Sequence, residues 1–227
     1  MGSIRGSSFY TIVNGPTWSQ AEANSVALGG HLVTINDSGE NTYLKTTVRE
    51  EIISQYGLSG EKTARGQWIN HPFTGLADAQ RNGNWSWASG ESLDYLNWYP
   101  GEPSGGGEYF GTIYLIGDTS TYNSLGFWNN SADGGQIGIA EIPLSYFSVS
   151  DLTVTEGSSG TVTITRTGGT QSTQSLTLTS SNGTASAGSD YTAINTSISF
   201  AAGETSKTVS ISTINDSTVE STESFNL

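Results

Sequence analysis

The polar side chains best suited to chemistry gather in one stretch of the chain, residues 97–130. Two of its carboxylates, Glu102 and Glu108, fall in a segment rich in glycine and proline. Calcium prefers oxygen ligands and takes six to eight of them on a flexible loop. The candidate oxygen ligands in the stretch are Glu102, Ser104, Glu108, Asn129 and Asn130. Their types and spacing predict a calcium site built on loops.

The charge of the whole chain narrows the partners of such a site. The 227 residues include 21 Asp and Glu against 8 Lys and Arg, a formal net charge of −13. Nucleic acids and anionic membrane surfaces both recruit clustered Lys and Arg, so the balance argues against both as partners. No apolar run approaches the roughly 18 residues of a membrane helix, so membrane insertion is not expected. Acidity fits a protein that holds divalent cations, and solubility alone is an equally common reason for it.

Cysteine is absent from the chain. Each domain must therefore be stable through its core alone or with bound metal. The chain begins without the apolar core of a signal peptide and stops inside a predicted strand. We therefore expect a fragment of a longer protein, with neighbouring domains as its covalent partners.

A change of composition near Pro143 predicts two domains, residues 1–143 and 144–227. All six tryptophans and both helical patterns precede this point. The chain after it is rich in Ser, Thr and Gly, and has no helical period. The first domain should therefore mix helices and strands, and the second should be all β.

The first region offers alternating strand and helix signals. Residues 8–15 alternate like a strand, and Thr17 can cap a helix that follows it. Residues 31–35 predict a short strand. Ser38 can cap a second helix, which should stop before Gly57.

The two histidines are not expected to bind metal, because neither has a second His or Cys nearby. His31 stands at a strand start, which favours a packing or hydrogen-bonding role. His71 stands beside Pro72, and we expect it in a solvated loop.

The aromatic residues allow two interpretations. Trp85, Trp87, Trp98 and Tyr99 could stack on sugar rings. The neighbours of Trp85, Trp87 and Trp128 alternate between apolar and polar residues, as in strands. This alternation favours a place in the core for these three side chains.

Several short motifs, in this order, resemble the C-type lectin-like domain over about residues 7–143. The motifs are Trp18-Ser19-Gln20-Ala21-Glu22-Ala23, Gly30-His31-Leu32-Val33-Thr34-Ile35, Phe73-Thr74-Gly75-Leu76, Trp85-Ser86-Trp87, Asn97-Trp98, Pro100-Gly101-Glu102-Pro103-Ser104 and Trp128-Asn129-Asn130. The resemblance implies an α+β fold in which residues 73–76 form a packing element.

The same resemblance places Glu102, Ser104, Glu108, Asn129 and Asn130 on the family's calcium positions. It implies that Glu102, Ser104, Glu108 and Asn129 also bind sugar, because such residues hydrogen-bond the pair of sugar hydroxyls that completes the metal shell. It further implies a cis peptide bond between Glu102 and Pro103.

Three departures from the family's pattern matter. Ser104 stands where Asn or Asp is usual, and Asn130 stands where Asp is usual, so both should weaken calcium binding. The triplet Glu102-Pro103-Ser104 does not decide between mannose-type and galactose-type sugars. The family's animal members carry disulfides, whereas Phe110 stands near a usual cysteine position. The last departure points to a bacterial lineage.

The second region predicts a β-sandwich. Its strands are expected at residues 148–154, 160–167, 176–180, 194–200 and 207–214. The segments that carry a resemblance to the Calx-β domain, from about residue 145 to 227, are Val154-Thr155-Glu156-Gly157, Asn182-Gly183-Thr184-Ala185, Gly188-Ser189-Asp190-Tyr191, Ala202-Gly203-Glu204-Thr205 and Ile214-Asn215-Asp216.

That resemblance implies a second, weaker calcium site at Glu156, Asp190 and Asp216. Three carboxylates are a thin ligand set for a hard dication. The resemblance also implies a last strand after Leu227, so the sandwich is expected to lack its final strand.

Together these observations predict a calcium-dependent carbohydrate-binding module of a bacterial secreted or cell-surface adhesive protein. The alternative is a metal-independent module that binds a protein partner or serves as structure, without a sugar site. An enzyme is not expected. Glu102 and Glu108 lie six residues apart on a glycine-rich segment, and the sequence holds no nucleophile elbow, paired histidines or phosphate loop.

Overall fold

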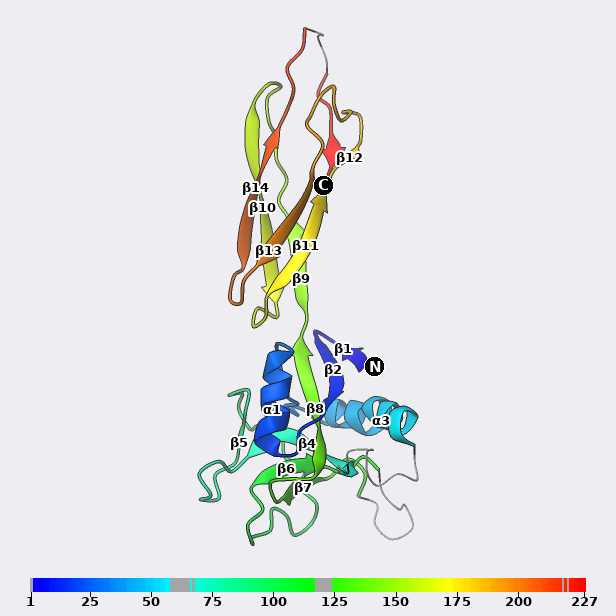
Figure 1. Cartoon of the computed structure of the whole chain (residues 1–227), viewed down its shortest axis with the longest axis vertical. Coiled ribbons are helices and arrows are strands. Elements are labelled where there is room, and N and C mark those ends of the chain that lie inside the picture. The colour runs from blue at the N-terminus through cyan, green and yellow to red at the C-terminus, as the bar shows by residue number, and fades with distance from the viewer. Residues whose placement is uncertain (1, 58–65, 67, 117–123, 218, 220) are drawn as a thin grey trace. The chain divides into compact units, whose positions relative to one another are not determined.

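The computed structural model describes residues 2–57, 66, 68–116, 124–217, 219 and 221–227. The chain divides into two compact units, Met1–Leu144 and Ser145–Leu227 (Figure 1). Within the described ranges, no helix combines the length and the apolar character needed to span a membrane.

The first unit is built on one mixed sheet. Its path runs β1-β2-β8-β4-β6-β7, with β3 paired to β8 and β5 paired to β4. The strands are β1 Gly2–Arg5, β2 Ser8–Val13, β3 His31–Leu32, β4 Trp68–Ala77, β5 Ser86–Trp87, β6 Phe110–Ile113, β7 Trp128–Ser131 and β8 Gln136–Pro143. Strand β8 is central because it pairs with β2, β3 and β4. The strand predicted at residues 31–35 is shorter than expected, and β1 was not predicted.

Two helical segments complete this unit. Helix α1, Trp18–Ala27, begins as predicted, because the Thr17 hydroxyl accepts a hydrogen bond from the Gln20 amide at 3.1 Å. The second segment runs through α2 Ser38–Tyr43, a π-helical turn η1 Leu44–Val48, and α3 Arg49–Tyr56. The predicted cap at Ser38 is wrong. Asp37 caps this helix instead, since its carboxylate accepts from the Glu40 amide at 2.7 Å.

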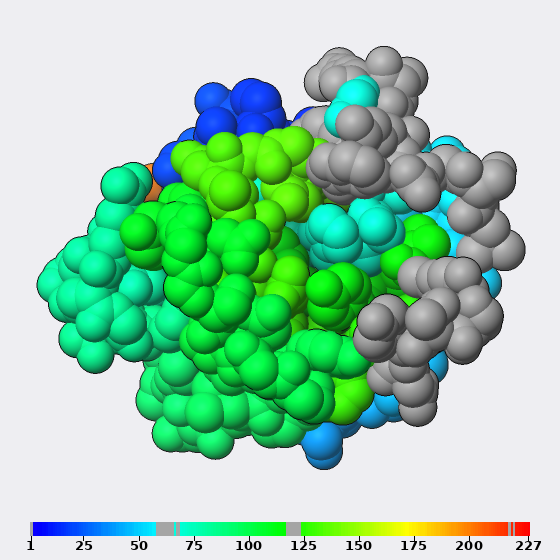
Figure 2. Space-filling model, turned by 90° about the horizontal axis from the view of Figure 1, so that it is seen from below, coloured from blue at the N-terminus to red at the C-terminus, as the bar shows by residue number. Residues whose placement is uncertain are grey.

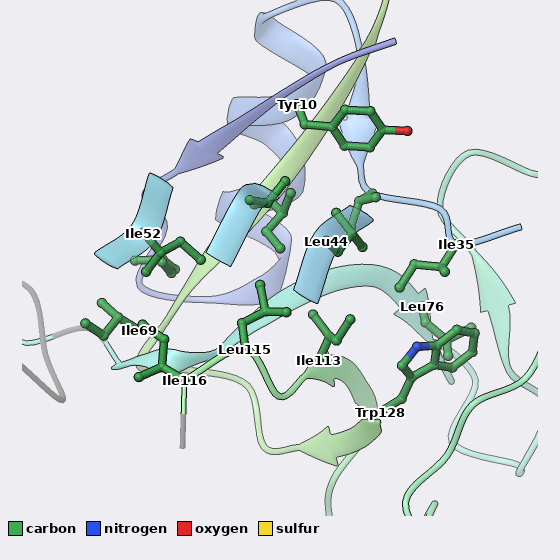
Figure 3. Close-up of a cluster of buried hydrophobic side chains, with 14 of the residues drawn as sticks. Tyr10, Ile35, Leu44, Ile52, Ile69, Leu76, Ile113, Leu115, Ile116 and Trp128 are labelled. Carbon is green, nitrogen blue, oxygen red and sulfur yellow. The ribbon is translucent and has the colours of Figure 1, made fainter. Parts of the chain in front are cut away.

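The core of the first unit lies between the second helical segment and the sheet. Figure 3 shows Leu44 and Ile52 pointing from the helices toward Ile113 and Ile69 of the sheet. Residues 73–76 are all buried, which agrees with their expected packing role. Trp87 and Trp128 are also buried, and Trp85 packs partly buried against the same cluster. The expected place in the core is confirmed for Trp87 and Trp128, whereas Trp85 packs at the edge of the core.

The prediction for His71 is wrong. It lies in strand β4 rather than in a solvated loop, and its ring meets Tyr114 edge-on at 5.6 Å. Burial lowers the pKa of His71. His31 follows expectation, because its Nδ1 lies 2.8 Å from Glu22 Oε1.

The second unit is all β, as predicted. The strands are β9 Ser145–Val149, β10 Ser159–Gly168, β11 Gln174–Thr179, β12 Ser181–Asn182, β13 Asn195–Phe200, β14 Ser206–Ser212 and β15 Phe225–Asn226. They pair as β14-β10-β9, β11-β13 and β12-β15. The first expected strand is displaced, because β9 ends at Val149 and residues 150–154 lie outside it.

A small apolar core joins the sheets of this unit. Val162 and Ile164 of β10 alternate inward and meet Ile198 and Phe200 of β13. Beside this core, the buried guanidinium of Arg166 donates to the carbonyl oxygen of Gly169 at 2.6 and 3.0 Å. Backbone carbonyl groups thus supply hydrogen-bond acceptors to the buried guanidinium. A buried charge without such partners would cost folding free energy.

Two acids, the buried Glu40 and the half-buried Glu141, share the hydroxyl of Tyr10 in the first unit. The Tyr10 hydroxyl lies 2.6 Å from Glu40 Oε1 and 3.3 Å from Glu141 Oε1. Burial first, and then the charge of Glu40, raises the pKa of Glu141 to about 7. A protonated Glu141 can donate to the Tyr10 oxygen while Tyr10 donates to Glu40. One added proton, on Glu141, therefore gives each of the three groups a hydrogen-bond partner.

This arrangement predicts that the first unit loses stability as the pH rises from about 4.5 to about 7. Because the pKa of Glu141 is higher in the folded state, its contribution is complete below about pH 4.5 and is lost as the pH rises through about 7. The loss is on the order of 3 kcal/mol. We expect Glu141→Gln to flatten the dependence, because the amide donates to Tyr10 at every pH.

The measurement is urea unfolding of the full chain between pH 4.5 and pH 8.5. Tryptophan fluorescence reports on the first unit alone, because every Trp precedes residue 144. Glu50→Gln is the control, since this exposed side chain lies on α3 away from Tyr10. A Glu141→Gln variant as pH-dependent as the unaltered protein would contradict this interpretation.

Candidate functional site

The stretch predicted to hold the site folds around Trp128. This side chain is 1% exposed, and its indole nitrogen donates to Asn41 Oδ1 at 2.8 Å. The Asn41 amide in turn donates to the Gly126 carbonyl at 2.9 Å. The backbone of Trp128 accepts from the Tyr99 amide and donates to the Asn97 carbonyl, both at 2.8 Å. The start of the loop is thereby fixed to strand β7.

Four of the five predicted metal ligands lie together in one cluster centred on Ser104. The Ser104 amide donates to Glu102 Oε2 at 2.6 Å and to Asn130 Oδ1 at 3.1 Å. The Ser104 hydroxyl donates to Glu108 Oε2 at 3.2 Å. The peptide bond between Glu102 and Pro103 is cis, as expected. We call Glu102, Ser104, Glu108 and Asn130 the loop cluster.

Asn130 holds the loop cluster to the sheet. It is fully buried in β7, and its amide nitrogen donates to the carbonyl oxygens of Ser104 at 2.6 Å and Glu108 at 3.0 Å. A buried amide with both donors and its oxygen used is fully satisfied. The two ends of the loop are therefore closed by side-chain hydrogen bonds.

Asn129 stands apart from the loop cluster. It alternates with buried Trp128 and Asn130 along β7 and is half-buried, so its side chain projects from the opposite face of the strand. Within the described part of the chain, no hydrogen bond joins its side chain to the loop cluster. The structure thus brings four predicted metal ligands together and places the fifth, Asn129, on the other face of β7.

The loop cluster carries negative charge that no basic side chain of the described residues neutralises. Among the described residues, the ion pairs are Arg5–Asp37, His31–Glu22, Arg49–Glu50 and Lys207–Glu204, and none involves the loop cluster. Burial first, and then the nearby Glu102, Tyr99 and Glu108, raises the pKa of Tyr114. The negative charge of the loop cluster therefore acts on Tyr114, which directly follows strand β6.

Two of the three acidic residues predicted in the second unit accept hydrogen bonds from the backbone. Glu156 Oε1 accepts from the Asp216 amide at 2.9 Å, and Asp190 Oδ2 accepts from the Ser186 amide at 2.6 Å. Glu156 and Asp190 line one groove of about 720 Å³. No group of three or more His, Asp and Glu side chains in the described ranges is arranged to hold a metal ion. Glu156, Asp190 and Asp216 are not gathered as a metal cluster in the structure.

An aromatic group beside the loop was only partly foreseen. Tyr99 was a candidate for stacking, whereas Tyr114 and Phe127 were not singled out. The Tyr99 ring meets Tyr114 at 6.3 Å and Phe127 at 5.8 Å between ring centroids. Pairing of residues 110–113 with residues 128–131 would have placed Tyr114 opposite Phe127. That register depends on a connection that the sequence pattern does not define.

Comparison with known proteins bears on both units. Residues 14–135 match the Lectin C-type domain family and residues 140–227 match the Calx-beta domain family. A perlucin-like protein of Mytilus galloprovincialis is 29% identical over 40% of this chain and 50% of its own length. The galactose-specific lectin nattectin of Thalassophryne nattereri is 31% identical over 38% of this chain and 45% of its own length. The chain thus spans about half the length of these relatives.

Solved structures agree on the fold of the first unit. Human lithostathine superposes with a TM-score of 0.50 at 18% identity, covering 63% of this chain and 96% of that structure. The predicted α+β lectin-like fold followed by a β-rich unit is confirmed. The chain belongs to the C-type lectin domain family, and its lectin-like domain is followed by a Calx-beta domain.

Proposed function

We propose that the chain is a calcium-dependent carbohydrate-binding module of an extracellular adhesive protein. The observation that carries the proposal is the loop cluster, in which two carboxylates meet at Ser104 without a basic partner among the described residues. Oxygen donors of this kind suit calcium. The similarity to lectins, including one named galactose-specific, supports sugar as the ligand.

The chemistry would be divided among the chain's own residues. Glu102, Ser104, Glu108 and Asn130 Oδ1 would hold the ion, which supplies coordination to a pair of sugar hydroxyls. The carboxylates of Glu102 and Glu108 also accept hydrogen bonds from those hydroxyls, and the Asn129 amide can donate to one of them. Because Asn129 lies on the other face of β7, its part requires a ligand that reaches past the strand edge.

The second unit would serve as a spacer between neighbouring domains. We propose at most weak calcium binding there, at Glu156, Asp190 and Asp216, because the carboxylates of Glu156 and Asp190 already accept hydrogen bonds from backbone amides. The proposed extracellular location rests on the likeness to lectins. The absence of cysteine supports a bacterial source, although the relatives described above are a mussel and a fish protein.

A second candidate function is metal-independent binding. It is favoured by Asn130, whose amide already closes the loop through Ser104 and Glu108. A loop that is ordered without an ion can present its carboxylates directly to a ligand.

Removing the two carboxylates tests the calcium proposal. We expect the unaltered chain to bind calcium with a Kd of about 10⁻⁴–10⁻³ M, the range of extracellular modules. The Glu102→Gln, Glu108→Gln variant should bind at least about tenfold more weakly, because two anionic ligands become neutral. Calorimetric titration measures both values.

The matched control is Glu50→Gln with Glu91→Gln, which removes the same charge from exposed positions outside the loop cluster. Glycan binding is then compared with calcium and with a chelator. Binding that the chelator leaves unchanged would favour the metal-independent alternative. Absence of calcium heat at millimolar calcium would refute the metal site.

Asn130→Asp provides an independent test. The substitution removes both donors from the carbonyls of Ser104 and Glu108 and adds a charge. Without calcium, we expect the variant to lose about 1–3 kcal/mol of stability, the cost of buried groups without partners. With calcium, its Tm should rise more than that of the unaltered chain. Equal calcium-induced shifts in both proteins would show that this position does not face the ion.

A further inference from the structure

Arg81 has a backbone conformation that few side chains adopt. Its φ is 55°, and among the described residues it is the one residue other than glycine in the left-handed region. That region favours glycine, because a Cβ atom is crowded there. Such conformations persist only where the surrounding structure holds them, and they concentrate at binding sites. The contacts that hold Arg81 are therefore informative about function.

A buried carboxylate holds the turn that contains Arg81. Asp78 is 4% exposed, and its side chain accepts hydrogen bonds from the amides of Asn82 at 3.0 Å and Gly83 at 2.7 Å. The Arg81 amide donates to the Asp78 carbonyl at 3.1 Å. Hydrogen bonds thus fix the backbone at Arg81 and at the two residues after it, so the direction of the Arg81 side chain is restricted before any ligand arrives.

The same turn is tied to the chain beside the loop cluster. The Asp78 amide donates to the Tyr109 carbonyl at 2.9 Å, and Tyr109 directly follows Glu108 of the loop cluster. The guanidinium carbon of Arg81 lies 4.8 Å from the centroid of the Tyr109 ring. In Figure 2, the teal segments that follow β4 lie beside the green loop on one face of the first unit. The turn therefore borders the loop cluster.

The guanidinium of Arg81 keeps its charge and its N–H donors for a ligand. Arg81 is exposed, and no ion pair or side-chain hydrogen bond joins its guanidinium to another of the described residues. The face of the Tyr109 ring attracts a cation but supplies no full negative charge. A planar guanidinium of this kind suits a carboxylate or a sulfate, which it can bind through two parallel hydrogen bonds.

The charge balance of this region changes sign when calcium binds. Glu102, Glu108 and Arg81 together carry one net negative charge, because two carboxylates outweigh one guanidinium. The calcium ion of the proposed function adds two positive charges, which leaves one net positive charge. Charges act on one another within a Debye length, about 10 Å at 0.1 M ionic strength. The calcium-loaded site therefore attracts an anionic ligand, and Arg81 is the group that can bind its charge directly.

We propose that Arg81, supported by the ring of Tyr109, forms a subsite for an anionic substituent on the sugar chain that the loop cluster holds. The substituent is a carboxylate or a sulfate, so the ligand is an acidic saccharide. This inference rests on the proposed carbohydrate-binding function and deepens it, because it names the class of sugar. Arg81 discriminates acidic from neutral sugars and takes no part in holding the ion.

The test compares matched acidic and neutral trisaccharides on the full chain, by calorimetric titration in buffered millimolar calcium. The probes are the linear trimers of galacturonate, mannuronate and glucuronate, the neutral methyl ester of each, and the trimer of galactose with and without 6-sulfation. We expect an acidic trimer to bind at least about tenfold more tightly than its neutral counterpart, because it gains a charge-assisted bidentate contact. Arg81→Asn should bring the ratio of the two affinities to about one, since Asn tolerates the left-handed conformation and carries no charge.

Three variants serve as controls. Arg81→Lys keeps the charge without the planar fork and should retain part of the acidic preference. Tyr109→Phe keeps the aromatic face and should retain all of it. Lys207→Asn removes one positive charge from the second unit and should not alter the preference. Urea unfolding followed by tryptophan fluorescence verifies that the first unit of each variant is folded at the assay temperature.

The outcomes separate the subsite from the proposed function. A preference confined to the uronates identifies a carboxylate, and one confined to the sulfated trimer identifies a sulfate. Equal affinities for acidic and neutral trimers overturn the subsite and leave the proposed function standing. An acidic preference that survives Arg81→Asn overturns the subsite, and so does an equal loss of acidic and neutral affinity, which assigns Arg81 to support of the loop. If no trimer binds, the proposed function fails and the subsite fails with it.

Discussion

The burial of Trp128 is the constraint on which the candidate site depends. Once its indole is held in the core by Asn41, the alternation of β7 turns Asn130 inward and Asn129 outward. The same residue anchors the start of the loop through backbone bonds to Asn97 and Tyr99. The side chain of Trp128 therefore determines the positions of both the loop cluster and Asn129, which stands apart from it.

The loop cluster combines two features that usually oppose each other. Its two carboxylates both accept hydrogen bonds from Ser104, and no ion pair in the described part of the chain neutralises them. Its backbone is nevertheless held by the Asn130 amide, so the loop does not have to be ordered by that ligand. A site arranged in this way loses less conformational entropy on binding than a loop that must first fold. Asn130 stands where the family usually has Asp. It therefore removes a charged ligand, but its amide holds the loop in place before any ligand binds.

The fold and much of the loop cluster could be predicted from the sequence, because both depend on local signals. Thr17 precedes a helical period, and Glu102 and Ser104 flank a proline. Two kinds of information were not local. Asp37 and Ser38 are both good capping residues, and only the helix geometry chooses between them. His71 and Tyr114 meet across the sheet through the pairing of strands, and the sequence around Pro72 suggested a loop. The acidic residues of the second unit were individually noticed, but whether their side chains gather into a metal cluster depends on tertiary structure.

The pairing of β2 with β8 brings the two ends of the lectin-like fold together. Ser8 stands opposite Pro143 in an antiparallel register, and neighbours in such a pair are about 5 Å apart. The chain between Ser8 and Pro143 therefore begins and ends at neighbouring positions, and it carries the whole loop cluster. A domain whose two ends lie side by side can be inserted into another protein without moving that protein's flanking segments apart. Recognition loops can then diversify while the architecture that displays them keeps its spacing.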